Sequence, residues 1–142
     1  MGNEARSKGV SRRRFGAIYF AHRSVALGQR ARRLIGAHAK YLERHPGMLV
    51  AVVGHRDAAE TAAQPARLGK ARAAAVRDCL ESLGVHESRM TTASFGDRMP
   101  RYAGSGAALR AANRRVDIIY FGASVAGGSP PAARKRAGRI RR

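Results

Sequence analysis

The feature that most constrains this chain is an apolar segment that stops abruptly at a charged turn. Every residue of Met48–Val53 is apolar, without the alternation of a half-exposed strand. Such a run is typical of a strand that is covered on both faces. Gly54–Asp57 follows at once, and after a loop poor in apolar residues a helical pattern opens with Arg72 in its first turns. Asp57 and Arg72 are therefore predicted to face one another across the loop that leaves the end of the strand.

Hydrophobic periodicity places the other elements on both sides of this strand. We expect strands over 14–20, 89–95 and 113–121 and helices over 28–44, 65–83 and 107–112. Pro46 and Gly47 end the first long helix, and Gly84 occupies the usual C-terminal cap of the second. The stripe of the second helix that we expect to be buried consists of Leu68, Ala71, Ala75, Val76, Cys79, Leu80 and Leu83. The order strand, helix, strand, helix, strand, strand predicts an α/β (α+β) fold. It is a two-layer sandwich with helices on one face of a mixed four-stranded sheet.

Composition divides the chain into one domain and two basic ends. The 142 residues and the hydrophobic fraction of 44% are enough for one domain with its own core. We assign 14–122 to that domain, with a basic leader (1–13) and a tail rich in Gly, Pro and Arg (123–142), both expected to be disordered. The formal net charge is +19, from 28 Lys and Arg against 9 Asp and Glu. A chain of this kind is attracted to polyanions of any class.

The basic leader raises the question of export. Ser11–Phe15 looks like the start of a twin-arginine signal. The apolar stretch behind it is interrupted by His22 and Arg23, which is poor for a signal core. We therefore expect the leader to run straight into the first strand, without a signal peptide.

The sequence predicts a protein without catalytic, metal or cofactor chemistry. Its five histidines are scattered without metal-ligand spacing. No nucleophile with a neighbouring base and no pair of carboxylates for acid–base work can be assembled. Cys79, the single cysteine, falls at a core-facing helical position and is expected to be a small buried residue.

Several motifs fall together in the order and at the spacing of one known domain family. Gly54–Asp57 is similar to a Gly-His-Thr-Asp motif, Leu68–Ala73 to a Leu-Ser-x-x-Arg-Ala helix start, and Asn113–Ile118 to an Asn-Arg-Arg-Val-Glu-Ile closing strand. Leu83–Val85 matches its Leu-Gly-Val, which follows that helix. Over roughly 16–122 the chain therefore resembles the OmpA-like peptidoglycan-binding domain of outer-membrane proteins, Pal lipoproteins and flagellar stator proteins.

The resemblance implies a ligand as well as a fold. In that family, the Asp of the Gly-His-Thr-Asp motif and the Arg of the second helix bind the diaminopimelate of the peptidoglycan stem peptide. Diaminopimelate carries an ammonium and a carboxylate on one carbon, so it requires an anion beside a planar cationic donor. The resemblance also implies a location in the periplasm or at the outer membrane. The implied ligand-binding residues are Asp57, Arg72, His55, Arg56, Asn113 and Arg115.

The chain departs from the family pattern at several ligand contacts, which leaves alternatives open. Arg56 replaces the family's Thr beside Asp57, and Pro65 replaces an Asn. Residue types alone favour a structural ion pair between Asp57 and Arg72, and it is the family spacing that favours a ligand site. The alternative function is a degenerate domain that binds lipopolysaccharide or nucleic acid through its basic surface. The predicted partners are the diaminopimelate stem peptide, anionic lipid or another polyanion at the basic tails, and a second copy in a homodimer.

Overall fold

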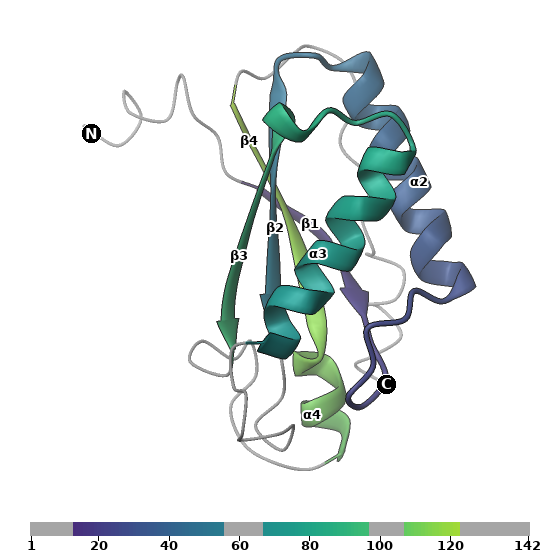
Figure 1. The fold of residues 1–142 in the computed structure, drawn as a ribbon, viewed down its shortest axis with the longest axis vertical. Coiled ribbons are helices and arrows are strands. Elements are labelled where there is room, and N and C mark those ends of the chain that lie inside the picture. The colour runs from purple at the N-terminus through teal and green to yellow at the C-terminus, as the bar shows by residue number, and fades with distance from the viewer. Residues whose placement is uncertain (1–12, 56–66, 97–106, 123–142) are drawn as a thin grey trace, which may run out of the picture.

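The computed structural model describes residues 13–55, 67–96 and 107–122 (Figure 1). Along the chain these form β1 (Arg13–Tyr19), α2 (Gln29–Arg44), β2 (Met48–His55), α3 (Arg67–Ser82), the 3₁₀ turn η1 (Glu87–Arg89), β3 (Met90–Gly96), α4 (Ala107–Asn113) and β4 (Arg115–Gly122). The predicted α/β order is confirmed, and the predicted boundaries hold to within about two residues. The leader and tail that were expected to be disordered lie outside the described residues, except for Arg13, which begins β1.

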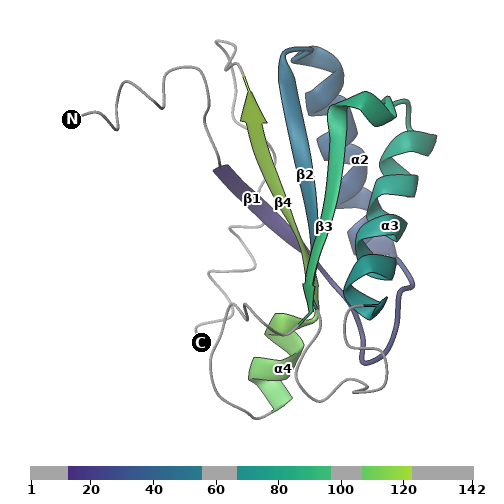
Figure 2. The same cartoon turned by 60° about the vertical axis from the view of Figure 1, so that its left-hand side comes forward.

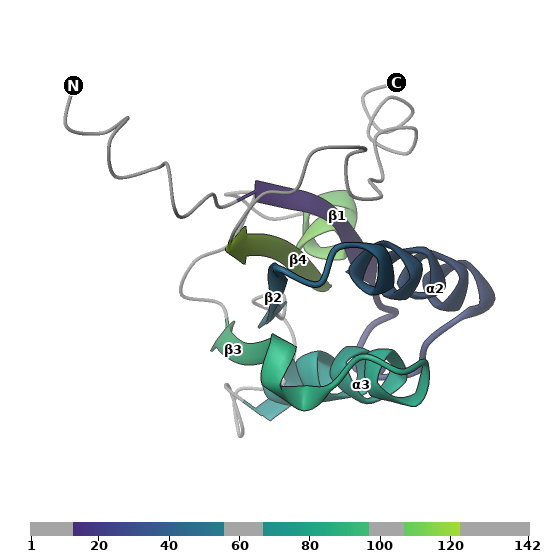
Figure 3. The same cartoon turned by 90° about the horizontal axis from the view of Figure 1, so that it is seen from above.

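The four strands form one mixed sheet in the order β1-β4-β2-β3. The β2 and β3 strands run parallel, while β4 is antiparallel to both β2 and β1. Both long helices, α2 and α3, cover the same face of this sheet (Figure 3). The short helix α4 lies beyond the end of the sheet where β2 and β3 finish and β4 begins (Figure 2). This two-layer architecture is the one that the sequence predicts.

The core fills the space between the sheet and the two long helices. The helices contribute their apolar stripes and β2 contributes alternate residues, with Val50 and Val52 completely buried. Leu49 and Ala51 point to the other face and are only half-buried. The prediction that this strand is covered on both faces was therefore wrong for its first half, because the helices cover one face only. None of the described helices has the length and apolar character that crossing a membrane requires.

The start of α3 lies unusually close to the end of β2. A Cβ atom added to Gly54 would overlap the carbonyl oxygen of Gly69, and one added to Gly69 would overlap the Ser94 hydroxyl. Only glycine at both positions allows this approach of backbone to backbone. The approach turns the next residues of the helix, Arg72 and Ala73, towards the sheet, and both are buried.

This contact corrects the predicted buried stripe of α3. Ala71 and Leu83 were expected in the core but are exposed, and Cys79 is half-buried against it. The end of the helix matches expectation. Gly84 has a φ of +103°, and the Val85 amide donates to the Leu80 carbonyl over 3.1 Å. This is the usual glycine-dependent helix end, and it folds Val85 back into the core.

Arg89 fixes the opposite end of the sandwich. Its Nη1 donates to the carbonyl oxygen of Leu42 over 2.8 Å. Its Nη2 donates to the carbonyl oxygens of His45 over 2.7 Å and Met48 over 2.8 Å. One guanidinium thereby bonds to carbonyls at the end of α2 and at the start of β2 and joins the helix end to the strand.

Candidate functional site

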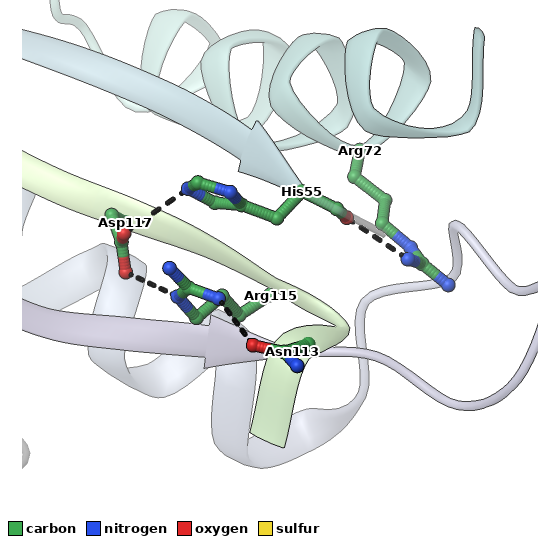
Figure 4. Close-up of polar contacts among 5 residues, drawn as sticks. All are labelled: His55, Arg72, Asn113, Arg115 and Asp117. Carbon is green, nitrogen blue, oxygen red and sulfur yellow. Dashed lines mark hydrogen bonds and ion pairs between the residues drawn. The ribbon is translucent and has the colours of Figure 1, made fainter. Parts of the chain in front are cut away.

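Five buried polar residues meet where β2 ends and where α3 and β4 begin (Figure 4). None of them is more than 5% exposed. They are His55 of β2, Arg72 of α3, Asn113 of α4, and Arg115 and Asp117 of β4. Charged side chains are almost never buried to this extent unless they are paired and hydrogen-bonded. The cluster is therefore a built polar site inside a largely apolar sandwich.

The Arg72 guanidinium is held in one orientation by backbone carbonyls. Nη1 donates to the His55 carbonyl over 3.0 Å. Nε donates to the Ser24 carbonyl over 2.9 Å, and Nη2 donates to the Ala21 carbonyl over 3.1 Å. Its Cζ also lies 5.2 Å from the centre of the Phe20 ring, within cation–π range. A planar fork with three fixed acceptors cannot rotate freely, so the direction of its charge is set by the fold.

Two of these acceptors belong to the turn that connects β1 to α2. The Ser24 amide donates to the Ala21 carbonyl over 3.0 Å and closes the turn. Arg23 within it has a φ of +59°, a left-handed conformation that few residues other than glycine adopt. Strained backbone of this kind persists where the surrounding structure requires it. Here it accompanies a turn whose carbonyls contact Arg72.

The remaining residues form a network beneath the end of β2. Arg115 Nε donates to Asp117 Oδ1 over 2.9 Å, and its Nη1 donates to Asn113 Oδ1 over 3.3 Å. His55 Nε2 lies 3.2 Å from Asp117 Oδ2, close enough for an ion pair when the imidazole is protonated, although poorly aligned for a hydrogen bond. Burial by itself would raise the pKa of Asp117, but the contacts with His55 and Arg115 outweigh it and hold that pKa below its ordinary value. Asp117 is therefore a carboxylate at neutral pH.

The geometry divides the site residues into two groups. Asn113, Arg115 and Asp117 bond to one another, so they are arranged to brace the His55 side chain from below. His55 in turn presents its backbone carbonyl to Arg72 at the point where β2 ends. The network of Asn113, Arg115 and Asp117 thus positions the end of β2, and the end of β2 positions the Arg72 guanidinium.

The structure brings together four of the six residues that the resemblance implicates. His55, Arg72, Asn113 and Arg115 share one cluster, while Arg56 and Asp57 lie outside the described residues. Asp117 was not singled out beforehand, although an acidic residue between Val116 and Ile118 is a recognisable anomaly in an apolar strand. The role of the Ala21 and Ser24 carbonyls could not have been predicted, because every residue has a backbone carbonyl and the sequence does not show which ones accept a hydrogen bond from Arg72. Among the described residues, no cluster of His, Cys, Asp and Glu could hold a metal ion.

Comparison with known proteins gives a consistent result. The model of the OmpA family matches residues 19–114. A peptidoglycan-associated lipoprotein of Legionella pneumophila is 34% identical over 101 residues, which cover 71% of this chain and 57% of that protein. The chain therefore spans less than two thirds of this relative's length, and it spans 61% of a similar lipoprotein from Agrobacterium fabrum.

Solved structures agree with the sequence comparison. The crystal structure of the peptidoglycan-associated lipoprotein from Burkholderia pseudomallei is similar with a TM-score of 0.70 and 34% identity, covering 74% of this chain and 89% of that one. The cell wall anchor of the type VI secretion system from Pseudomonas aeruginosa is similar with a TM-score of 0.64 and 26% identity, covering 85% and 93% of the two chains.

Proposed function

The chain belongs to the OmpA family, whose domains are non-catalytic, and on that premise we propose that it is a peptidoglycan-binding module of the cell envelope. The module holds the diaminopimelate of a stem peptide between the Asp57 carboxylate and the Arg72 guanidinium. Relatives named peptidoglycan-associated lipoprotein and a neighbour named cell wall anchor support this proposal. The proposal places the domain in the periplasm or at the outer membrane.

The observation that carries the proposal is the attachment of Arg72 to the His55 carbonyl. Asp57 follows His55 by two residues in the chain. Two residues of fully extended chain span at most about 7 Å, so connectivity alone keeps the Asp57 backbone near this carbonyl. The proposal takes the Asp57 carboxylate as the anion that accompanies this oriented cation. A ligand carbon bearing both an ammonium and a carboxylate requires such a pair.

The proposal is tested by titrating the protein with a muropeptide that contains diaminopimelate. Asp57→Asn removes the charge without changing side-chain size, and we expect about ten- to hundredfold weaker binding from the loss of a charge-assisted hydrogen bond. Asp78→Asn is the matched control, because Asp78 is 64% exposed and its carboxylate accepts hydrogen bonds from the neighbouring Arg77. Equal affinities of wild type and Asp57→Asn would rule out the proposed ligand geometry.

A second candidate function, binding of a polyanion such as lipopolysaccharide or nucleic acid, is supported by the outer face of α2. Arg30, Arg33, Lys40 and Arg44 are all exposed on this helix. At 3.6 residues per turn they lie within about 80° of one another and extend over about 21 Å. The helix has no acidic residue in its first turn and no side-chain cap. The cations near its N-terminus therefore lie at the positive end of the helix dipole, without a negative charge to offset it. We call these four residues the α2 ridge.

Salt dependence separates this function from the first. Binding through the α2 ridge falls steeply as salt rises, because each neutralised phosphate releases a counterion. Arg33→Glu with Lys40→Glu should reduce binding of lipopolysaccharide or DNA at least tenfold while leaving the muropeptide titration unchanged. Removal of residues 123–142 tests the contribution of the tail in the same assay. If neither change alters polyanion affinity, this second function is excluded.

A further inference from the structure

We propose that the groove between α3 and β3 binds an extended, acidic peptide segment of a partner protein, which pairs with β3 as an additional strand. This site is separate from the cluster around Arg72. It depends on the position of β3 at the edge of the described sheet and on the cations beside it.

The first support is the position of β3. The strand order places it at one edge of the sheet, paired with β2 on one side and with no other described strand on the second side. Thr91, Thr92 and Ala93 are exposed in succession, so both faces of the strand reach solvent at this point. An edge strand presents a row of backbone donors and acceptors that can pair with another chain. Strand addition of this kind is a recurring mode of peptide recognition.

The second support is the groove itself, which has a volume of about 510 Å³. That volume is within the usual range of ligand sites, roughly 300–1,000 Å³. Its walls carry small or polar side chains, which leave the space between helix and strand unfilled. They are Lys70, Ala71, Ala73, Ala74 and Arg77 of α3, and Thr92, Ala93 and Ser94 of β3. A bound strand would therefore have the edge of β3 on one side and the alanine face of α3 on the other.

The third support is charge. Lys70 and Arg77 stand at the groove seven residues apart, which is about 10.5 Å along a helix. Side chains on one face of an extended peptide repeat about every 6.8 Å, so acidic residues two to four positions apart reach both cations. Arg77 already contacts Asp78 over 2.8 Å, but both side chains are exposed, at 41% and 64%. Exposed pairs of this kind are weak and exchange readily.

Charge also selects the occupant. The tail of this chain, residues 123–142, contains six Arg and Lys and no acid, so the cations of the groove repel it. A second copy of the chain brings a formal charge of +19 to the same surface. An acidic segment of a different protein is therefore the occupant that the groove favours.

The test uses a labelled octapeptide that alternates Val and Glu, titrated at about 0.15 M salt and followed by fluorescence anisotropy. Lys70→Glu with Arg77→Glu should weaken binding at least about tenfold. Arg32→Glu is the control, since Arg32 is an exposed arginine outside both the groove and the α2 ridge, and this change should weaken binding less than about twofold. Amide chemical shifts should change along β3 from Thr91 to Ser94.

Two further measurements make the outcome decisive. An octapeptide methylated on alternate backbone nitrogens keeps its charge but cannot pair as a strand, so it should bind at least about tenfold more weakly. Asp57→Asn should leave octapeptide affinity unchanged, which keeps this result independent of the muropeptide site. The proposal is overturned by no binding up to about 1 mM, by equal effects of the groove double variant and of Arg32→Glu, by shifts confined to α2, or by undiminished binding of the methylated peptide.

Discussion

The stability of this domain should fall as the pH drops from about 6.5 to about 4, because His38 is buried in its neutral form. His38 is 1% exposed, and its Nδ1 lies 2.7 Å from the Tyr120 hydroxyl. Its Nε2 has no hydrogen-bond partner in the described structure, so a proton added there would be buried without an acceptor. Burial accordingly lowers the pKa of His38 from 6.5 to about 4.

The size and sign of the effect follow from this shift. Between the two pKa values the unfolded chain takes up a proton that the folded chain does not, so the free energy of unfolding decreases as the pH falls. The lowering of the pKa from 6.5 to about 4 corresponds to a loss of about 3 kcal/mol, which is nearly complete at pH 4. A loss of that size is a large fraction of the roughly 5–15 kcal/mol that stabilises an ordinary domain.

The assay is urea unfolding at a series of pH values, compared between wild type and His38→Gln. Gln keeps a polar group near Tyr120 but does not titrate, so its unfolding free energy should be nearly flat between pH 6.5 and 4. Parallel pH dependences of the two proteins would refute the assignment.

Three other predictions concern the backbone contacts and the buried charges. Gly54→Ala should destabilise the fold by about 1–3 kcal/mol in urea unfolding, because the added Cβ atom overlaps the Gly69 carbonyl. Gly36→Ala, which has open space around it, should be neutral or stabilising by up to about 1 kcal/mol. Equal effects of the two substitutions would contradict a tight contact between Gly54 and Gly69. The lowered pKa of Asp117 means that its charge stabilises the fold above about pH 4 and that this contribution disappears as the pH falls through the lowered pKa. Asp117→Asn should therefore be less stable than wild type at pH 7 and lose less stability below pH 4, as acid titration followed by circular dichroism would measure. The same loss of stability below pH 4 in both proteins would contradict this. Arg89→Lys should cost about 1–3 kcal/mol in thermal unfolding, since a lysine cannot reach three carbonyl oxygens at once, and an unaltered melting temperature would contradict that role.

The predictable parts of this structure are those that local patterns encode. The stripe of Ile35, His38 and Leu42 repeats at helical spacing, and these residues are buried as that spacing predicts. Gly84 ends its helix because only a residue that tolerates positive φ fits there. Such features depend on a few neighbouring residues, so a single sequence is sufficient to identify them.

The features that escaped prediction depend on contacts between distant segments. The face that α3 turns to the sheet is decided by the approach of Gly69 to Gly54, and hydrophobic periodicity carries no record of that approach. Arg72 was expected at a ligand site but not at 0% exposure. The sequence does not distinguish a buried arginine from an exposed one, because the hydrogen-bond acceptors that allow burial come from distant segments.

The three carbonyl bonds of Arg72 also have a consequence for how the domain folds. They join residues that are 17, 48 and 51 positions apart in the sequence. Contacts of such long range form late, after the loop-closure entropy between those segments has been overcome. A chain that has formed only some of its elements therefore has no oriented guanidinium at this position. Any ligand that contacts it binds the completely folded domain, and its binding energy adds to the global free energy of unfolding rather than to a local opening.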